Sequence, residues 1–257
     1  MFKNCCGILN SFIDKGLDIG RKINPQTVAC IADNWVSSIC GLLMYLIGIV
    51  YFLRSIIYAI KCESMDFIWM GLGMLAASVL MNYIGSKVLS NIRGLYSKTV
   101  SKLRSNAILD CIALLCVLLG IGALVLGFKV DMGIGGILGG ILLMLIFLLV
   151  ALTALSPAIL AVELNETCSA GEELIGLLTF FMKNFLFVLP YLYIVGLGYL
   201  LYILLFQLGI QAEYSSIMVM MTPPIIVFGL LPLMAYFLYL AYYFILDLCR
   251  AILSIGK

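Results

Sequence analysis

Residues 132–162 of the chain read MGIGGILGGILLMLIFLLVALTALSPAILAV, a stretch of 31 residues without one charged side chain. The hydrocarbon core of a bilayer is about 30 Å thick, and a helix that rises ~1.5 Å per residue crosses it in about 20 residues. The stretch is therefore long enough to span a membrane. It lacks the alternation of apolar and polar residues that a barrel strand requires, so the pattern predicts a helix.

Five further apolar stretches lie on either side of this one. Four of them carry no charge at all, at 67–86, 111–128, 184–212 and 214–246. The fifth contains a single charged residue, Arg54, whose long side chain can reach the membrane surface from near the end of a helix. We therefore expect an all-α, polytopic membrane bundle with amphipathic interfacial helices and six transmembrane helices, at about 36–60, 67–86, 107–128, 134–162, 185–208 and 223–247.

The composition excludes a soluble globular domain. Hydrophobic residues make up 64% of the chain and charged residues only 11%, with a mean hydropathy of +1.19. Soluble domains are about half apolar and about a quarter charged. Histidine is absent, which removes imidazole as a general base and as a haem or zinc ligand, and the nine cysteines form no C-x-x-C pair. We therefore expect no enzymatic activity, no cofactor and no metal site.

Basic residues are distributed unevenly between the two ends of the expected helices. If both termini are cytoplasmic, two Lys residues, Lys61 and Lys129, lie on the opposite side and 11 Lys and Arg residues lie on the cytoplasmic side. These 11 residues are Lys3, Lys15, Arg21, Lys22, Lys87, Arg93, Lys98, Lys102, Arg104, Arg250 and Lys257. Cytoplasmic loops are enriched in Lys and Arg, so we expect this orientation.

Two segments outside the expected spans are amphipathic. Within residues 1–35, the first 24 place apolar side chains at steps of three and four, which is typical of a helix that lies on a membrane surface. The linker 86–106 has a similar pattern and is basic. It predicts contact with the anionic headgroups of the cytoplasmic leaflet through Lys87, Arg93, Lys98, Lys102 and Arg104. The alternative is a solvated linker. An acidic stretch at 163–173 offers a complementary partner for this linker.

Small residues and prolines mark places where helices can approach closely or bend. Three pairs with small-x-x-x-small spacing predict close packing, within the bundle rather than between copies of the chain. These pairs are Gly135 and Gly139, Gly136 and Gly140, and Gly73 and Ala77. Pro190 and Pro232 predict kinks in the fifth and sixth helices, and Thr222-Pro223-Pro224 predicts the start of the sixth helix.

The first helix of each expected hairpin carries a similar short motif. Segments 45–49, 117–121 and 193–197 align without gaps and share a central glycine, at position 48, 120 or 196. The match has two explanations: a threefold repeat of helical hairpins, or chance, because a chain with 24 glycines easily produces such matches.

The few ionised residues lie near the expected membrane surfaces, and Lys183 falls just before the fifth span. Transporters normally place such residues in the middle of the membrane. We therefore expect a non-enzymatic accessory or scaffolding subunit of a membrane assembly. Its expected partners are membrane lipids and other membrane protein subunits or copies of itself, and not nucleic acid. The alternative is a small permease or channel gated by the kinked fifth and sixth helices.

Overall fold

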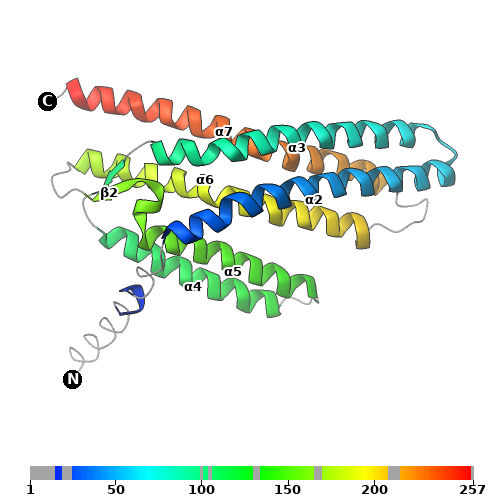
Figure 1. Ribbon diagram of the computed structural model, residues 1–257. Helices are drawn as coiled ribbons and strands as arrows, with labels where there is room; N and C mark the ends of the chain where they lie inside the picture. Colours follow the sequence, from blue (N-terminus) through cyan, green and yellow to red (C-terminus); the bar gives the residue numbers. More distant parts are fainter. Residues whose placement is uncertain are drawn as a thin grey trace. The chain divides into compact units, whose positions relative to one another are not determined.

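The computed structural model describes residues 15–18, 25–98, 101–103, 106–129, 134–164, 170–207 and 215–255. Within this part of the chain, six helices are long and apolar enough to cross a membrane. They lie at Ser38–Cys62, Asp66–Ile92, Ala107–Lys129, Gly136–Leu155, Gly171–Phe206 and Met218–Ile252. The expected all-α class and the expected number of membrane-spanning helices are confirmed (Figure 1).

The long helices follow one another along the chain as three hairpins. The first pairs α2 (Pro25–Cys62) with α3 (Asp66–Lys98), the second α4 (Ala107–Lys129) with α5 (Ile134–Leu155), and the third α6 (Ala170–Tyr202) with α7 (Ser215–Ile255). A π-helix, η2 (Ile203–Gln207), continues α6. A 3₁₀ helix, η1 (Pro157–Leu160), and strand β2 (Val162–Leu164) follow α5, and β2 pairs in parallel with β1 (Ser101–Leu103).

The fourth membrane helix is shorter than the apolar stretch that predicts it. The stretch continues to Val162, but α5 ends at Leu155. Pro157 disfavours helical backbone at the residue before it, and Ser156 accordingly leaves the helical region, with φ −128° and ψ 68°. The apolar residues that follow form η1 and β2 instead of a further helical turn.

Four other helices extend beyond the expected bounds. α2 begins at Pro25 instead of about 36, and α6 begins at Ala170 instead of about 185. α7 begins at Ser215, so Pro223 and Pro224 lie inside the helix and do not start it. Membrane helices tolerate interior prolines where neighbouring groups bond the freed carbonyls. α3 continues to Lys98, so the first part of the basic linker prolongs a membrane helix and does not form a separate one.

Most of the expected N-terminal interfacial segment lies outside the described residues. The structure describes 15–18, which are helical, and the beginning of α2 from Pro25. The division of the chain at residue 35 therefore stays a prediction. By packing, the chain forms two compact units: unit 1 comprises Met1–Ile31 and Tyr96–Val188, and unit 2 comprises Ala32–Leu95 and Leu189–Lys257.

Unit 1 contains the α4–α5 hairpin, whose two backbones touch. A Cβ atom on Gly127 of α4 would lie 2.6 Å from the carbonyl oxygen of Gly136 and 2.9 Å from the Cα atom of Gly140, both on α5. Only glycine permits so close an approach. The buried residues of α4 form one stripe, Leu109, Ala113, Cys116 and Gly120.

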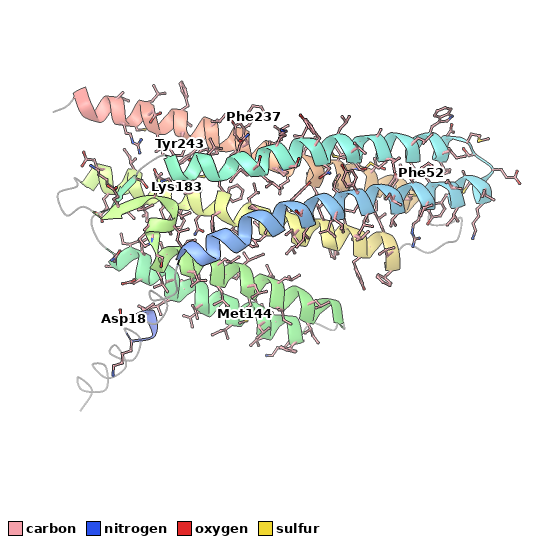
Figure 2. All side chains as sticks on the ribbon, viewed as in Figure 1. Asp18, Phe52, Met144, Lys183, Phe237 and Tyr243 are labelled. Atoms are coloured by element: carbon pink, nitrogen blue, oxygen red, sulfur yellow. The ribbon has the colours of Figure 1, made fainter. Side chains whose placement is uncertain are left out.

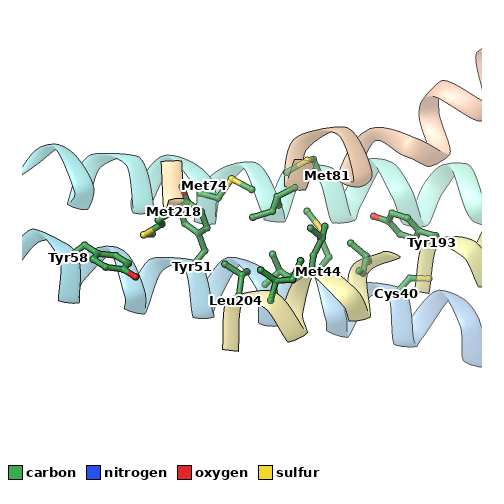
Figure 3. Close-up of a cluster of buried hydrophobic side chains, with 14 residues drawn as sticks. Cys40, Met44, Tyr51, Tyr58, Met74, Met81, Tyr193, Leu204 and Met218 are labelled. Carbon is green, nitrogen blue, oxygen red and sulfur yellow. The ribbon is translucent and has the colours of Figure 1, made fainter. Parts of the chain in front are cut away.

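Unit 2 has a core of methionine, tyrosine and branched aliphatic side chains (Figure 3). The buried members are Cys40, Met44, Ile47, Tyr51, Tyr58, Met74, Met81, Tyr193, Leu197, Leu200, Ile203, Leu204, Met218 and Ile225. Methionine side chains adapt to irregular gaps between helices. One hydrogen bond, 2.6 Å long, joins the hydroxyl groups of Tyr51 on α2 and Thr222 on α7 across this core.

The three glycines of the aligned motif, Gly48, Gly120 and Gly196, each lie close to a neighbouring helix. A Cβ atom on the first glycine would meet Ser78 on α3. On Gly120 it would lie 3.4 Å from the Cβ atom of Phe147 on α5, and on Gly196 it would meet the ring of Phe228 on α7. Each glycine therefore faces the other helix of its own hairpin, as Gly71 and Gly127 also do outside the motif, so the threefold repeat stays a prediction.

Candidate functional site

Lys183 on α6 is the charged residue that the sequence placed just before the fifth span. It lies inside the continuous helix α6 (Figure 2). The residue is 0% exposed. Its ammonium group donates to the carbonyl oxygen of Leu160 at 2.7 Å, to that of Ala161 at 3.1 Å and to the hydroxyl of Ser101 at 3.4 Å. We call these four residues the Lys183 joint.

The irregular backbone after α5 supplies the acceptors of the Lys183 joint. Carbonyl groups in the last turn of a helix lack a donor from their own helix. Ala161 ends η1 in the left-handed conformation, with φ 50°, and the carbonyl groups of Leu160 and Ala161 then accept from Lys183. A cation is favourable at this end of a helix because the carbonyl dipoles point toward it. Burying an ammonium is costly, and hydrogen bonds to all three of its N–H groups offset that cost.

The paired strands fix the same region of unit 1. Lys102 on β1 stands opposite Glu163 on β2 in the parallel register, so the basic linker and the acidic stretch meet at this position. A Cβ atom on Gly176 of α6 would meet the carbonyl oxygen of Lys102, so α6 passes β1 in close contact. Gly176 precedes Lys183 by about two helical turns and so lies on the same side of α6.

A second polar contact joins α5 to α6 beside the Lys183 joint. The buried Thr153 hydroxyl lies 3.0 Å from Oδ1 of Asn184 and 2.8 Å from the carbonyl oxygen of Val150. Hydroxyl and amide side chains often link membrane helices in this way. The polar residues here connect elements of unit 1 to each other.

In unit 2, Arg54 on α2 makes a comparable connection. Its Nη2 atom donates to the carbonyl oxygen of Leu205 in the π-helix at 2.9 Å. The sequence predicted that Arg54 reaches toward the membrane surface, and the structure shows that the guanidinium binds backbone at the end of α6. Both Arg54 and Lys183 thus stabilise irregular backbone at the end of a membrane helix.

Prolines and a glycine surround a buried tyrosine in the same unit. A Cβ atom on Gly85 of α3 would lie 3.5 Å from the hydroxyl of Tyr193 on α6 and 3.9 Å from Cγ of Pro232 on α7. The thiol of Cys40 on α2 donates to the carbonyl oxygen of Pro190 at 3.9 Å. We call these five residues the Tyr193 layer, which contains both prolines for which the sequence predicts kinks. Pro190 and Pro232 each lie inside a continuous helix.

The predicted lipid-binding residues do not form one helical surface. Lys87 is exposed on α3, with its Nζ atom 5.8 Å from the centroid of the Tyr83 ring, and Lys102 is exposed on β1. Arg93 and Lys98 lie within α3, but their side chains are outside the described part, as is the whole of Arg104. Contact of these residues with lipid stays a prediction.

The predicted packing residues divide into two groups. Gly136 and Gly140 lie against Gly127 of α4, and Ala77 packs against the core of unit 2. Among the described residues, no atom of a neighbouring element lies within 4 Å of a Cβ atom on Gly73 or Gly139. Gly135 lies in α5, and its surroundings are outside the described part.

Sequence reasoning missed the Lys183 joint and the two strands. The available signals were a lysine beside a long apolar stretch and the Ser156-Pro157 pair inside another. Neither signal says that the two segments meet. Among the residues that the structure describes, no group of three or more His, Cys, Asp or Glu is placed to hold a metal ion.

No family model, curated protein or solved structure matches the chain. The assignment therefore depends on the helices and their packing. Six long apolar helices arranged as hairpins define an integral, multi-pass α-helical membrane protein.

Proposed function

We propose that this membrane protein is a non-enzymatic accessory or scaffolding subunit of a larger membrane assembly. The observation that carries the proposal is the Lys183 joint. An ionised residue in a transporter faces the substrate path. Here the buried ammonium donates to backbone carbonyls and a hydroxyl of its own unit, so it stabilises the connection between α5 and α6.

The outward surface of α4 supports a role in contacts with other membrane helices. The four buried residues of this helix lie on one stripe, and apolar side chains cover its other faces. Leu118 is 65% exposed, and Leu115 and Leu126 are similarly exposed. We infer that an apolar helix of another membrane protein packs on this surface, where it displaces lipid.

A tryptophan substitution at Leu118 tests the scaffolding role. Lipid accommodates a larger apolar side chain, whereas a packed helix interface is disrupted by one. Leu118→Trp is therefore expected to reduce the amount of partner protein that co-purifies in mild detergent, measured by quantitative mass spectrometry, with no change in melting temperature.

The matched control is Leu238→Trp on α7, which replaces an equally apolar residue that is 55% exposed. It should retain the partners. A wild-type protein that extracts as a clean, stable monomer would contradict the scaffolding role, and equal partner loss in the two variants would contradict the assignment to α4.

Basic residues that contact anionic lipid would attach the protein to the cytoplasmic leaflet. Replacing Lys87 and Lys102 with glutamine should lower the anionic lipid retained by the purified protein, because each basic residue near an anionic surface contributes about 1 kcal/mol. Lys102 stands opposite Glu163, so Lys87 should account for most of the loss. Lipid mass spectrometry measures the effect.

Lys129→Gln is the control for the lipid experiment, because Lys129 is exposed at the end of α4 that is predicted to face away from the cytoplasm. It should leave the retained anionic lipid unchanged. If all three substitutions have the same effect, the basic residues do not select a leaflet.

The second candidate function is a small permease or channel gated by α6 and α7, in which Pro190 and Pro232 predict kinks. The Tyr193 layer favours it, because Pro232 and the hydroxyl of Tyr193 both lie beside Gly85 inside unit 2. A proteoliposome uptake assay compares the two candidates: faster solute entry with wild-type protein than with Pro232→Ala would favour the permease.

A further inference from the structure

Tyr193 presents its hydroxyl inside unit 2. Only 1% of the residue is exposed, and the hydroxyl has no hydrogen-bond partner within the part of the chain that the structure describes. A buried hydroxyl that makes no hydrogen bond lowers the stability of the folded state, so each such group requires an explanation.

The hydroxyl of Tyr193 lies beside Gly85 of α3 and the ring of Pro232 on α7. A Cβ atom on Gly85 would lie 3.5 Å from this hydroxyl and 3.9 Å from the ring of Pro232. Glycine contributes no side chain there. The nearby thiol of Cys40 already donates to the carbonyl oxygen of Pro190.

Pro232 also frees a hydrogen-bond acceptor on α7. Proline has no N–H group, so the carbonyl oxygen of Phe228, four residues earlier in the helix, loses its usual donor. Gly196 follows Tyr193 on α6 by less than one turn, and a Cβ atom on it would meet the ring of Phe228. The turn of α6 that carries Tyr193 therefore faces the turn of α7 that carries the freed carbonyl.

We propose that Tyr193 and the carbonyl oxygen of Phe228 bind a water molecule between α6 and α7, beside Gly85 of α3. Water can donate to the carbonyl while it exchanges a hydrogen bond with the hydroxyl, and a buried water needs two or more polar partners of this kind. Ordered water is a recognised partner for carbonyls that proline frees in membrane helices. The ligand is small and uncharged, because the two groups that bind it are neutral.

Radiolytic footprinting of the full chain in nanodiscs tests the site, because hydroxyl radicals formed from bound water oxidise the side chains beside it. Tyr51 is the matched internal control: it is 0% exposed, and its hydroxyl already bonds to Thr222 at 2.6 Å. Tyr193 is expected to be oxidised several times faster than Tyr51. Equal, slow oxidation of the two tyrosines would overturn the proposal.

Thermal unfolding of Tyr193→Phe is an independent test. The sign of the change in melting temperature distinguishes a hydroxyl that bonds to water from one that makes no bond. If water bonds to the hydroxyl, removing the hydroxyl breaks that bond and lowers the melting temperature. If the hydroxyl makes no bond, the phenylalanine variant melts higher than wild type, and an unchanged or higher melting temperature overturns the proposal. Tyr51→Phe should melt lower in either case, which shows that the assay detects one lost hydrogen bond.

Discussion

Lys183→Met is expected to destabilise the protein by about 3 kcal/mol, since hydrogen bonds to a charged group contribute about 1.5–3 kcal/mol each. Methionine has a similar length but no donor. The Leu160 carbonyl and the Ser101 hydroxyl then lose their bonds to the ammonium, whereas the Ala161 carbonyl keeps its bond from the backbone N–H of Ser101 at 3.2 Å. Denaturant unfolding of the full chain in detergent measures the loss.

The change in the free energy of unfolding of Lys183→Met shows which of two opposing contributions is larger. Removing the ammonium also removes the cost of burying a charge, which amounts to several kcal/mol. We expect the lost hydrogen bonds to dominate because the Leu160 carbonyl and the Ser101 hydroxyl stay buried without the ammonium as a donor. Lys129→Met, at an exposed position in the same unit, should change stability by no more than about 0.5 kcal/mol. A Lys183→Met protein as stable as wild type would contradict the structural role of the joint.

Gly127→Ala is expected to destabilise unit 1 by about 1–3 kcal/mol, the usual cost of inserting atoms into a closely packed interface. The added methyl group would lie 2.6 Å from the carbonyl oxygen of Gly136 and 2.9 Å from the Cα atom of Gly140. Both are backbone atoms, so no side-chain rotation relieves the clash and the helices α4 and α5 must separate. The free energy of unfolding in detergent measures the effect.

Gly122→Ala is the control for this prediction, because it lies on the same helix and no atom of a neighbouring element in the described part of the chain lies within 4 Å of a Cβ atom there. Alanine favours a helix over glycine by up to about 1 kcal/mol, so this variant should be equally or more stable than wild type. If the two variants lose the same amount of stability, the backbone contact at Gly127 does not explain the effect.

The membrane helices were predictable because each depends on a local property of the chain. A helix such as α4 satisfies its own backbone hydrogen bonds and needs only a continuous apolar stretch, which is visible in the sequence at 111–128. Helix ends were less predictable. Pro157 ended α5 early, whereas Pro223 and Pro224 lie inside α7, since a proline's effect depends on what surrounds it.

The polar contacts were harder to predict because each joins segments far apart in the chain. Lys183 was recognised as a charge at the edge of an apolar stretch, but its partners lie 22, 23 and 82 residues away. Tyr193 looked like one more residue of an apolar run, and only the packing of unit 2 places it beside Gly85.

Residue chemistry alone establishes that this chain crosses a membrane as helices, because apolar stretches of about 20 residues without the alternation of a barrel strand satisfy their backbone hydrogen bonds in a bilayer as helices. The contacts of Lys183 and Tyr193, in contrast, depend on the tertiary structure. A lysine became a buried link between helices and a tyrosine became a candidate water ligand, since hydrogen bonding depends on which distant groups folding brings within about 3 Å.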